Sequence, residues 1–156
     1  MRTRPNELRA LSVVVAALGA VQVAAGLSLL LTPVWFYGTI AEYAPYNRHF
    51  LGDTGAFVLA LGIGLVLAAR KLPQQRLLVG VAALGSAVHT ANHFIDDVLS
   101  PAAVPAYWTT NTLPLLVTTV LLAYVYLRLG ALRRAPAQVS QHSTSASQVP
   151  GPHGSS

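Results

Sequence analysis

Four apolar runs, each close to the length of a membrane-spanning helix, constrain this chain more than any other feature of its sequence. They cover residues 11–31, 50–69, 77–95 and 111–127. A helix needs about 20 residues to cross the hydrocarbon core of a bilayer. Helices are the expected form because an unpaired backbone group in lipid costs several kcal/mol. The sequence therefore predicts an all-α fold, a bundle of four transmembrane helices.

Composition supports this class. Of the 156 residues, 53% are hydrophobic and 10% are charged, whereas about a quarter of the residues in a soluble domain are charged. A multi-pass protein of the cell membrane is expected, with the lipid bilayer as its main contact. Cysteine is absent, which excludes disulfides and thiolate chemistry. The basic residues flank the apolar runs, so they indicate membrane topology and not nucleic-acid binding.

The first apolar run has a competing interpretation as a secretory signal peptide. Arg2, Arg4 and Arg9 precede it, and small residues in VQVAAG offer a cleavage site. However, the apolar core of a signal peptide is usually about 7–15 residues long, and this run is longer. An uncleaved helix is therefore predicted.

The distribution of basic residues predicts the orientation. Nine Lys and Arg residues lie before the first run, between the second and third runs, or after the fourth run, and only Arg48 lies in the other two loops. Loops rich in Lys and Arg stay on the cytoplasmic side. Both termini are therefore predicted to be cytoplasmic, and loops 32–48 and 96–110 are predicted to face outward.

The last part of the chain has a different composition. Residues 135–156 are rich in Pro, Ser, Gln and Gly and contain almost no large apolar side chain. Such a segment cannot bury enough surface to offset its chain entropy. The predicted organisation is a transmembrane domain, residues 1–134, followed by a disordered cytoplasmic tail, residues 135–156.

Small residues at a spacing of four predict the packing faces. Membrane helices approach one another closely where side chains are small. The predicted seams are Ala16, Ala20, Ala24 and Ser28 in the first helix, Ala56, Ala60, Gly64 and Ala68 in the second, and Ala82, Gly85 and Ser86 in the third.

Polar residues gather at the ends of the second and third helices that are predicted to face outward. The third run closes with HTANHFIDD, residues 89–97. His49 and Asp53 are four apart and share a helix face. His89, His93 and Asp96 are predicted to share another. Because the two helices run antiparallel, the sequence predicts one outward-facing His/Asp site between them.

The first chemistry that suits these residues is metal binding. Two His at positions i and i+4 can reach one ion, and His49 with Asp53 completes a set of four ligands, with Asp96 as the alternate. A divalent transition metal such as zinc accepts three His and a carboxylate. Thr90 stands where a zinc protease of the HExxH type has its general base, so that class is not expected.

The second chemistry is acid–base catalysis without a metal. Histidine changes charge near neutral pH, and Asp53, His89 and His93 are the candidate catalytic residues, acting on a small apolar substrate from the outer leaflet. The alternative is a non-enzymatic subunit bound to a membrane protein partner, or a small transporter. In these proteins the same residues relay protons or form structural hydrogen bonds between helices. The sequence leaves enzyme and subunit open.

Two stretches resemble a known kind of protein. YNRHFLGDTGAFVLALG and HTANHFIDD carry the patterns HFxxDxGAF and HxxNHxxD. They resemble small four-helix bacterial integral membrane proteins of unassigned function. The resemblance covers residues 33–97. It implies a four-helix fold and brings no activity with it.

Overall fold

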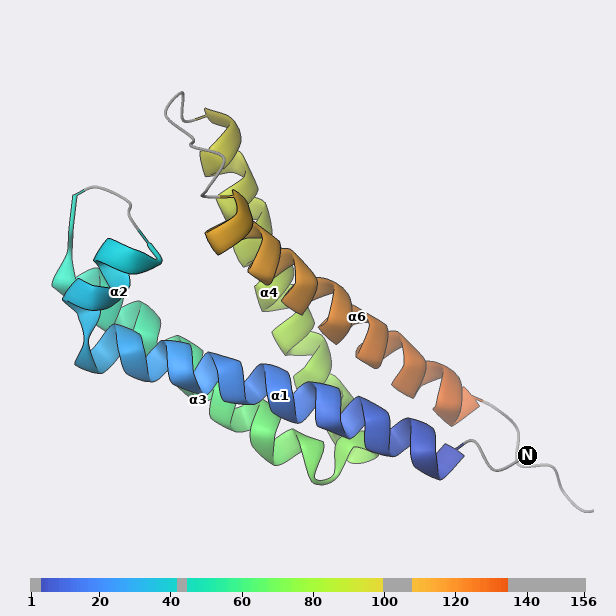
Figure 1. Cartoon of the computed structure of the whole chain (residues 1–156). Helices are drawn as coiled ribbons and strands as arrows, with labels where there is room; N and C mark the ends of the chain where they lie inside the picture. The colour runs from blue at the N-terminus through green and yellow to red at the C-terminus, as the bar shows by residue number, and fades with distance from the viewer. Residues whose placement is uncertain (1–3, 42–44, 100–107, 135–156) are drawn as a thin grey trace, which may run out of the picture.

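A computed structural model describes residues 4–41, 45–99 and 108–134 (Figure 1). Its elements are α1 (Arg4–Leu31), α2 (Pro33–Thr39), α3 (Arg48–Ala69), the 3₁₀-helix η1 (Leu72–Gln75), α4 (Arg76–Leu99), the π-helix η2 (Trp108–Thr112) and α6 (Leu113–Arg134). The all-α prediction is confirmed. The predicted tail lies outside the described residues.

Four of the helical segments are long and apolar enough to cross a membrane. These are Pro5–Leu31, Arg48–Ala69, Leu72–Leu99 and Leu113–Arg134. Each contains most of one predicted run, and each extends beyond it at one or both ends. The extensions add charged and polar turns to the spans. The chain is thus a multi-pass membrane protein with four candidate spans.

Local sequence explains two of the helix starts. Asn47 caps α3, because its side-chain oxygen accepts a hydrogen bond of 3.1 Å from the backbone N–H of Phe50. Pro33 begins α2, where a residue without an N–H is tolerated. The short helix α2 was not predicted. It follows α1 directly, within the segment expected to be a loop.

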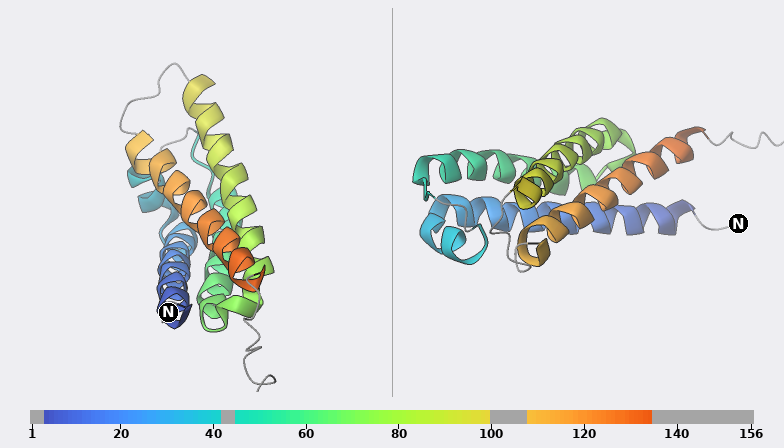
Figure 2. Two further views of the ribbon diagram at one scale, coloured as in Figure 1. Left: turned by 90° about the vertical axis from the view of Figure 1, so that its right-hand side faces the viewer. Right: turned by 90° about the horizontal axis from the view of Figure 1, so that it is seen from above.

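The helices form two antiparallel pairs. Helix α1 packs mainly on α3, and α4 packs mainly on α6. The pairs meet at the end that holds the start of α1, η1 and the end of α6, here called the basal end. They diverge toward the opposite, distal end (Figures 1 and 2). The predicted bundle is therefore compact only toward the basal end.

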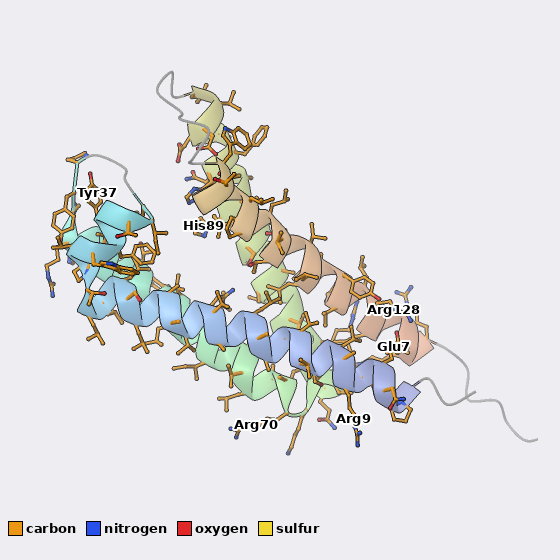
Figure 3. All side chains as sticks on the ribbon, in the orientation of Figure 1. Glu7, Arg9, Tyr37, Arg70, His89 and Arg128 are labelled. Atoms are coloured by element: carbon orange, nitrogen blue, oxygen red, sulfur yellow. The ribbon has the colours of Figure 1, made fainter. Side chains whose placement is uncertain are left out.

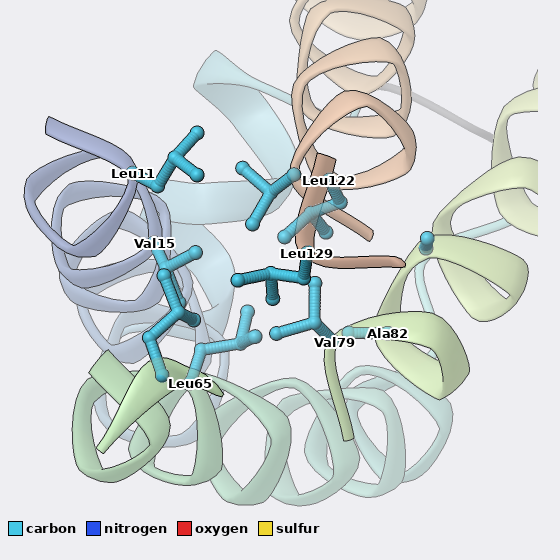
Figure 4. Packing of buried hydrophobic residues seen from close by; sticks show 10 residues of the cluster. Leu11, Val15, Leu65, Val79, Ala82, Leu122 and Leu129 are labelled. Carbon is cyan, nitrogen blue, oxygen red and sulfur yellow. The ribbon is translucent and has the colours of Figure 1, made fainter. Parts of the chain in front are cut away.

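The hydrophobic core lies where the pairs meet (Figure 4). All four long helices and η1 contribute, and their buried side chains are Leu11, Val15, Leu65, Leu72, Val79, Ala82, Ala83, Leu122, Val125 and Leu129. Most of these lie in the basal half of their helix. The core therefore fixes how the two pairs meet, and the distal halves are positioned by contacts within each pair.

Glycine brings α1 and α3 into backbone contact. The residues concerned are Gly19 and Gly26 on α1 and Gly55 and Gly62 on α3. A Cβ atom added to Gly26 would lie 2.5 Å from the backbone nitrogen of Leu59, and one on Gly62 would lie 2.9 Å from the carbonyl oxygen of Gly19. Only a residue without a side chain fits at such positions.

The predicted seams on α1 and α3 are largely wrong. Ala20, Ala24, Ala56 and Ala60 are exposed, whereas the glycines spaced seven apart are buried. A spacing of four drifts around the helix by about 40° at each step, but a spacing of seven drifts by only about 20°. On α4 the prediction is correct for Ala82 and Ser86, which are buried, and wrong for Gly85, which is exposed.

Candidate polar site at the distal end of α4

The distal half of α4 carries a line of ionisable side chains. His89, His93 and Asp97 follow one another at a spacing of four, so they lie on one face of the helix. At a rise of 1.5 Å per residue, the line extends for about 12 Å. Figure 3 shows His89 on the arm formed by α4 and α6. These three residues are here called the α4 polar line.

The two histidine rings are in direct contact. Their Nε2 atoms lie 3.1 Å apart, and the ring centroids are 4.8 Å apart with the planes inclined by 57°. A neutral imidazole has one protonated and one bare nitrogen. A hydrogen bond between these two atoms therefore requires one ring to donate through Nε2 and the other to accept.

Asp97 closes the line at its distal end. It is only 7% exposed, and its Oδ2 accepts a hydrogen bond from the hydroxyl of Thr112, which lies in η2 and is buried as well. The prediction that an outer loop begins at residue 96 is wrong, because α4 continues to Leu99. The spacing of His89, His93 and Asp97 was the signal that could have identified Asp97.

Asp96 belongs to the adjacent face. Its Oδ2 accepts a hydrogen bond of 3.1 Å from the side-chain amide of Asn92. Both residues are exposed. Asp96 was predicted as an alternate metal ligand, and the partner that the structure gives it is this amide.

Hydroxyl groups join α4 to α6 beside the polar line. The Thr90 and Thr119 Oγ1 atoms are 2.9 Å apart, and the Thr90 hydroxyl also lies 2.8 Å from the Ser86 carbonyl oxygen. Together with the Asp97–Thr112 hydrogen bond, this contact connects the distal half of α4 to α6 and η2. The polar line therefore has a hydrogen-bonded support on its own arm.

The other two predicted ligands lie on the opposite arm, which is formed by α1 and α3. His49 Nε2 and Asp53 Oδ2 are 3.5 Å apart on the first turns of α3, with side chains 89% and 62% exposed. In the described part of the chain, no group of three or more His, Cys, Asp or Glu side chains is placed to hold a metal ion. The four predicted ligands thus form two pairs, because α3 pairs with α1 and α4 pairs with α6.

Comparison with protein-family models, with curated proteins and with solved structures finds no match for this chain. The four candidate spans agree with the resemblance to small four-helix membrane proteins.

Proposed function

We propose that the α4 polar line is an acid–base site that binds and passes protons at the distal surface of this membrane protein. The contact of 3.1 Å between the Nε2 atoms of His89 and His93 carries the proposal. Two imidazoles in contact share one proton readily, but two protons at that distance repel each other. Histidine exchanges protons near neutral pH, so the pair is suited to take up and release a single proton.

Asp97 gives the line a direction. It lies one helical turn beyond His93 on the same face, and the Thr112 hydroxyl donates a hydrogen bond to its side chain. His89 is the member farthest from the distal end, so it is the residue that meets a substrate or partner in the bilayer. In this scheme His89 is the general base, and His93 passes the proton toward Asp97.

The distal end is proposed to face outward. The support is the excess of Lys and Arg in the segments at the basal end, which cytoplasmic loops of membrane proteins share. A single cysteine at the exposed Gln74 in η1 tests this, because the chain has no other cysteine. It should resist an impermeant thiol reagent in intact cells, and labelling there would reverse the orientation.

His49 and Asp53 form a separate His–carboxylate pair in this proposal. They lie on the first turns of α3, and both are exposed. Asp53 was predicted to act together with His89 and His93. On its own arm it acts instead with His49, as a second acid–base pair.

The geometry also supports a second candidate function, which is metal binding. Two His ligands of a tetrahedral zinc ion, each about 2.0–2.1 Å from the metal, have nitrogens a little more than about 3 Å apart. The Nε2 atoms of His89 and His93 have nearly this separation. They would supply half of a zinc site, and His49 with Asp53 would supply the rest if the arms approached each other.

Titration of the histidine rings tests the acid–base proposal. In ¹⁵N-labelled protein followed by NMR, protonation of one ring should hinder protonation of the other, so the wild type should show two separate steps. His93→Ala should leave His89 with one step, and His49→Ala should leave the two steps unchanged. Independent, identical titration of His89 and His93 in the wild type would contradict the proposal.

A further inference from the structure

Cationic side chains dominate the basal end. Among the side chains that the structure places at this end, Glu7 is acidic, and the basic ones are Arg9, Arg70, Lys71, Arg76, Arg128, Arg133 and Arg134. Such an excess of one sign attracts groups of the opposite sign. The contacts of each cation separate those that hold the protein together from those that face outward.

Three of these arginines are engaged within the protein. Arg128 Nε donates to Glu7 Oε1 at 3.0 Å and joins α6 to α1. Arg76 Nε donates to the carbonyl oxygen of Tyr126 at 3.2 Å, and its guanidinium carbon lies 3.9 Å from the centre of that ring. Arg133 donates to the carbonyl oxygen of Pro73. These contacts tie α6 to α1, α4 and η1.

Arg9, Arg70 and Lys71 differ from these arginines. All three are exposed, and none of the three side chains forms a hydrogen bond or ion pair with another described residue. Arg9 lies on α1, and the other two lie between α3 and η1, which also contacts α1. Figure 3 shows Arg9 and Arg70 projecting from the same edge of the molecule. Close contacts at Gly19 and Gly62 hold α1 against α3.

We propose that Arg9, Arg70 and Lys71 form a binding site for the headgroup of an anionic phospholipid. Arg70 and Lys71 stand directly between two candidate spans, which end at Ala69 and begin at Leu72. This position places them at the level of the lipid phosphates. An Arg guanidinium can bind phosphate through two parallel hydrogen bonds. The site is at the opposite end from the α4 polar line and does not depend on its chemistry.

Native mass spectrometry of the purified protein, exposed to equal amounts of phosphatidylglycerol and phosphatidylcholine, tests the site. The wild type should retain phosphatidylglycerol in preference. Each basic residue near a membrane surface contributes about 1 kcal/mol, which corresponds to about fivefold in affinity. Replacing Arg9, Arg70 and Lys71 together by Gln should therefore abolish the preference. The variants Arg9→Lys and Arg70→Lys should keep part of it, because they keep the charge but lose the paired hydrogen bonds.

Arg48→Gln is the matched control, because Arg48 is also exposed but begins α3 at the distal end. It should retain the wild-type preference. Equal retention of the two lipids by the wild type, or the same loss in Arg48→Gln as in the triple variant, would overturn the proposal. Displacement of the lipid by millimolar inorganic phosphate would overturn the lipid headgroup as the ligand.

Discussion

At the scale of single residues, glycine and threonine decide how closely the helices approach. A Cβ atom on Gly62 would lie 2.6 Å from the backbone nitrogen of Val23, but one on Gly52, in the same helix, would meet nothing within 4 Å. The two positions differ only in their surroundings. Alanine substitution at both positions therefore distinguishes the effect of packing from the intrinsic preference of a helix for alanine over glycine.

Gly62→Ala should therefore destabilise the protein by about 1–3 kcal/mol, because an extra methyl group in a tight contact forces backbone shifts. Gly52→Ala should be neutral or stabilising, since alanine is favoured over glycine inside a helix by about 1 kcal/mol. Thermal unfolding in detergent measures both. Equal melting temperatures for the two variants would show that α1 and α3 do not meet at Gly62.

The hydroxyl of Thr112 holds a buried carboxylate, and its removal should be costly. Thr112→Val leaves an oxygen of Asp97 without this donor, which typically costs about 1–3 kcal/mol. Thr118→Val is the control, because the Thr118 hydroxyl donates to the Pro114 carbonyl oxygen within its own helix, at 2.9 Å. Unfolding in detergent should distinguish the two variants. A Thr112 variant as stable as the Thr118 variant would mean that Asp97 does not depend on η2.

At the scale of helices, the sequence was sufficient to predict that four spanning helices exist. It was not sufficient to predict which helices pack against each other. Apolar length alone predicted the four spans, because the bilayer imposes it on each helix separately. Pairing depends on which faces match, and the alanine seams were misleading because alanine is abundant in the first three spans. The glycines at a spacing of seven, Gly19 with Gly26 and Gly55 with Gly62, carried the correct signal.

The candidate site shows the same division. The sequence predicted that His89 and His93 share one face, because this follows from helical periodicity within α4. The meeting of this pair with His49 and Asp53 required α3 to pack along α4 over its whole length. The structure instead pairs each of these helices with another neighbour.

At the scale of the whole molecule, the two arms should be farther apart at the distal end than at the basal end. Spin labels at Phe50 and Ile95 report the distal separation of α3 and α4, and labels at Leu67 and Leu77 report the basal one. All four side chains are exposed. Double electron–electron resonance in bilayers should give the longer distance for the distal pair, because the shared core lies toward the basal end.

Equal distances in the two label pairs would instead support the uniformly packed bundle expected from the sequence.

Adding zinc to the spin-labelled protein gives a second comparison. If all four predicted ligands bind one ion, zinc should shorten the distal distance and leave the basal one unchanged. The acid–base proposal predicts no change in either distance.

If His89 and His93 share one proton through their Nε2 atoms, ¹⁵N NMR of the labelled histidine rings should show it most directly. At a pH high enough for both rings to be neutral, one Nε2 should carry a hydrogen and the other should not. A scalar coupling across the hydrogen bond should connect them, and it should vanish in His93→Ala while persisting in His49→Ala. Two rings with the same protonation state at Nε2 and no coupling between them would contradict the account.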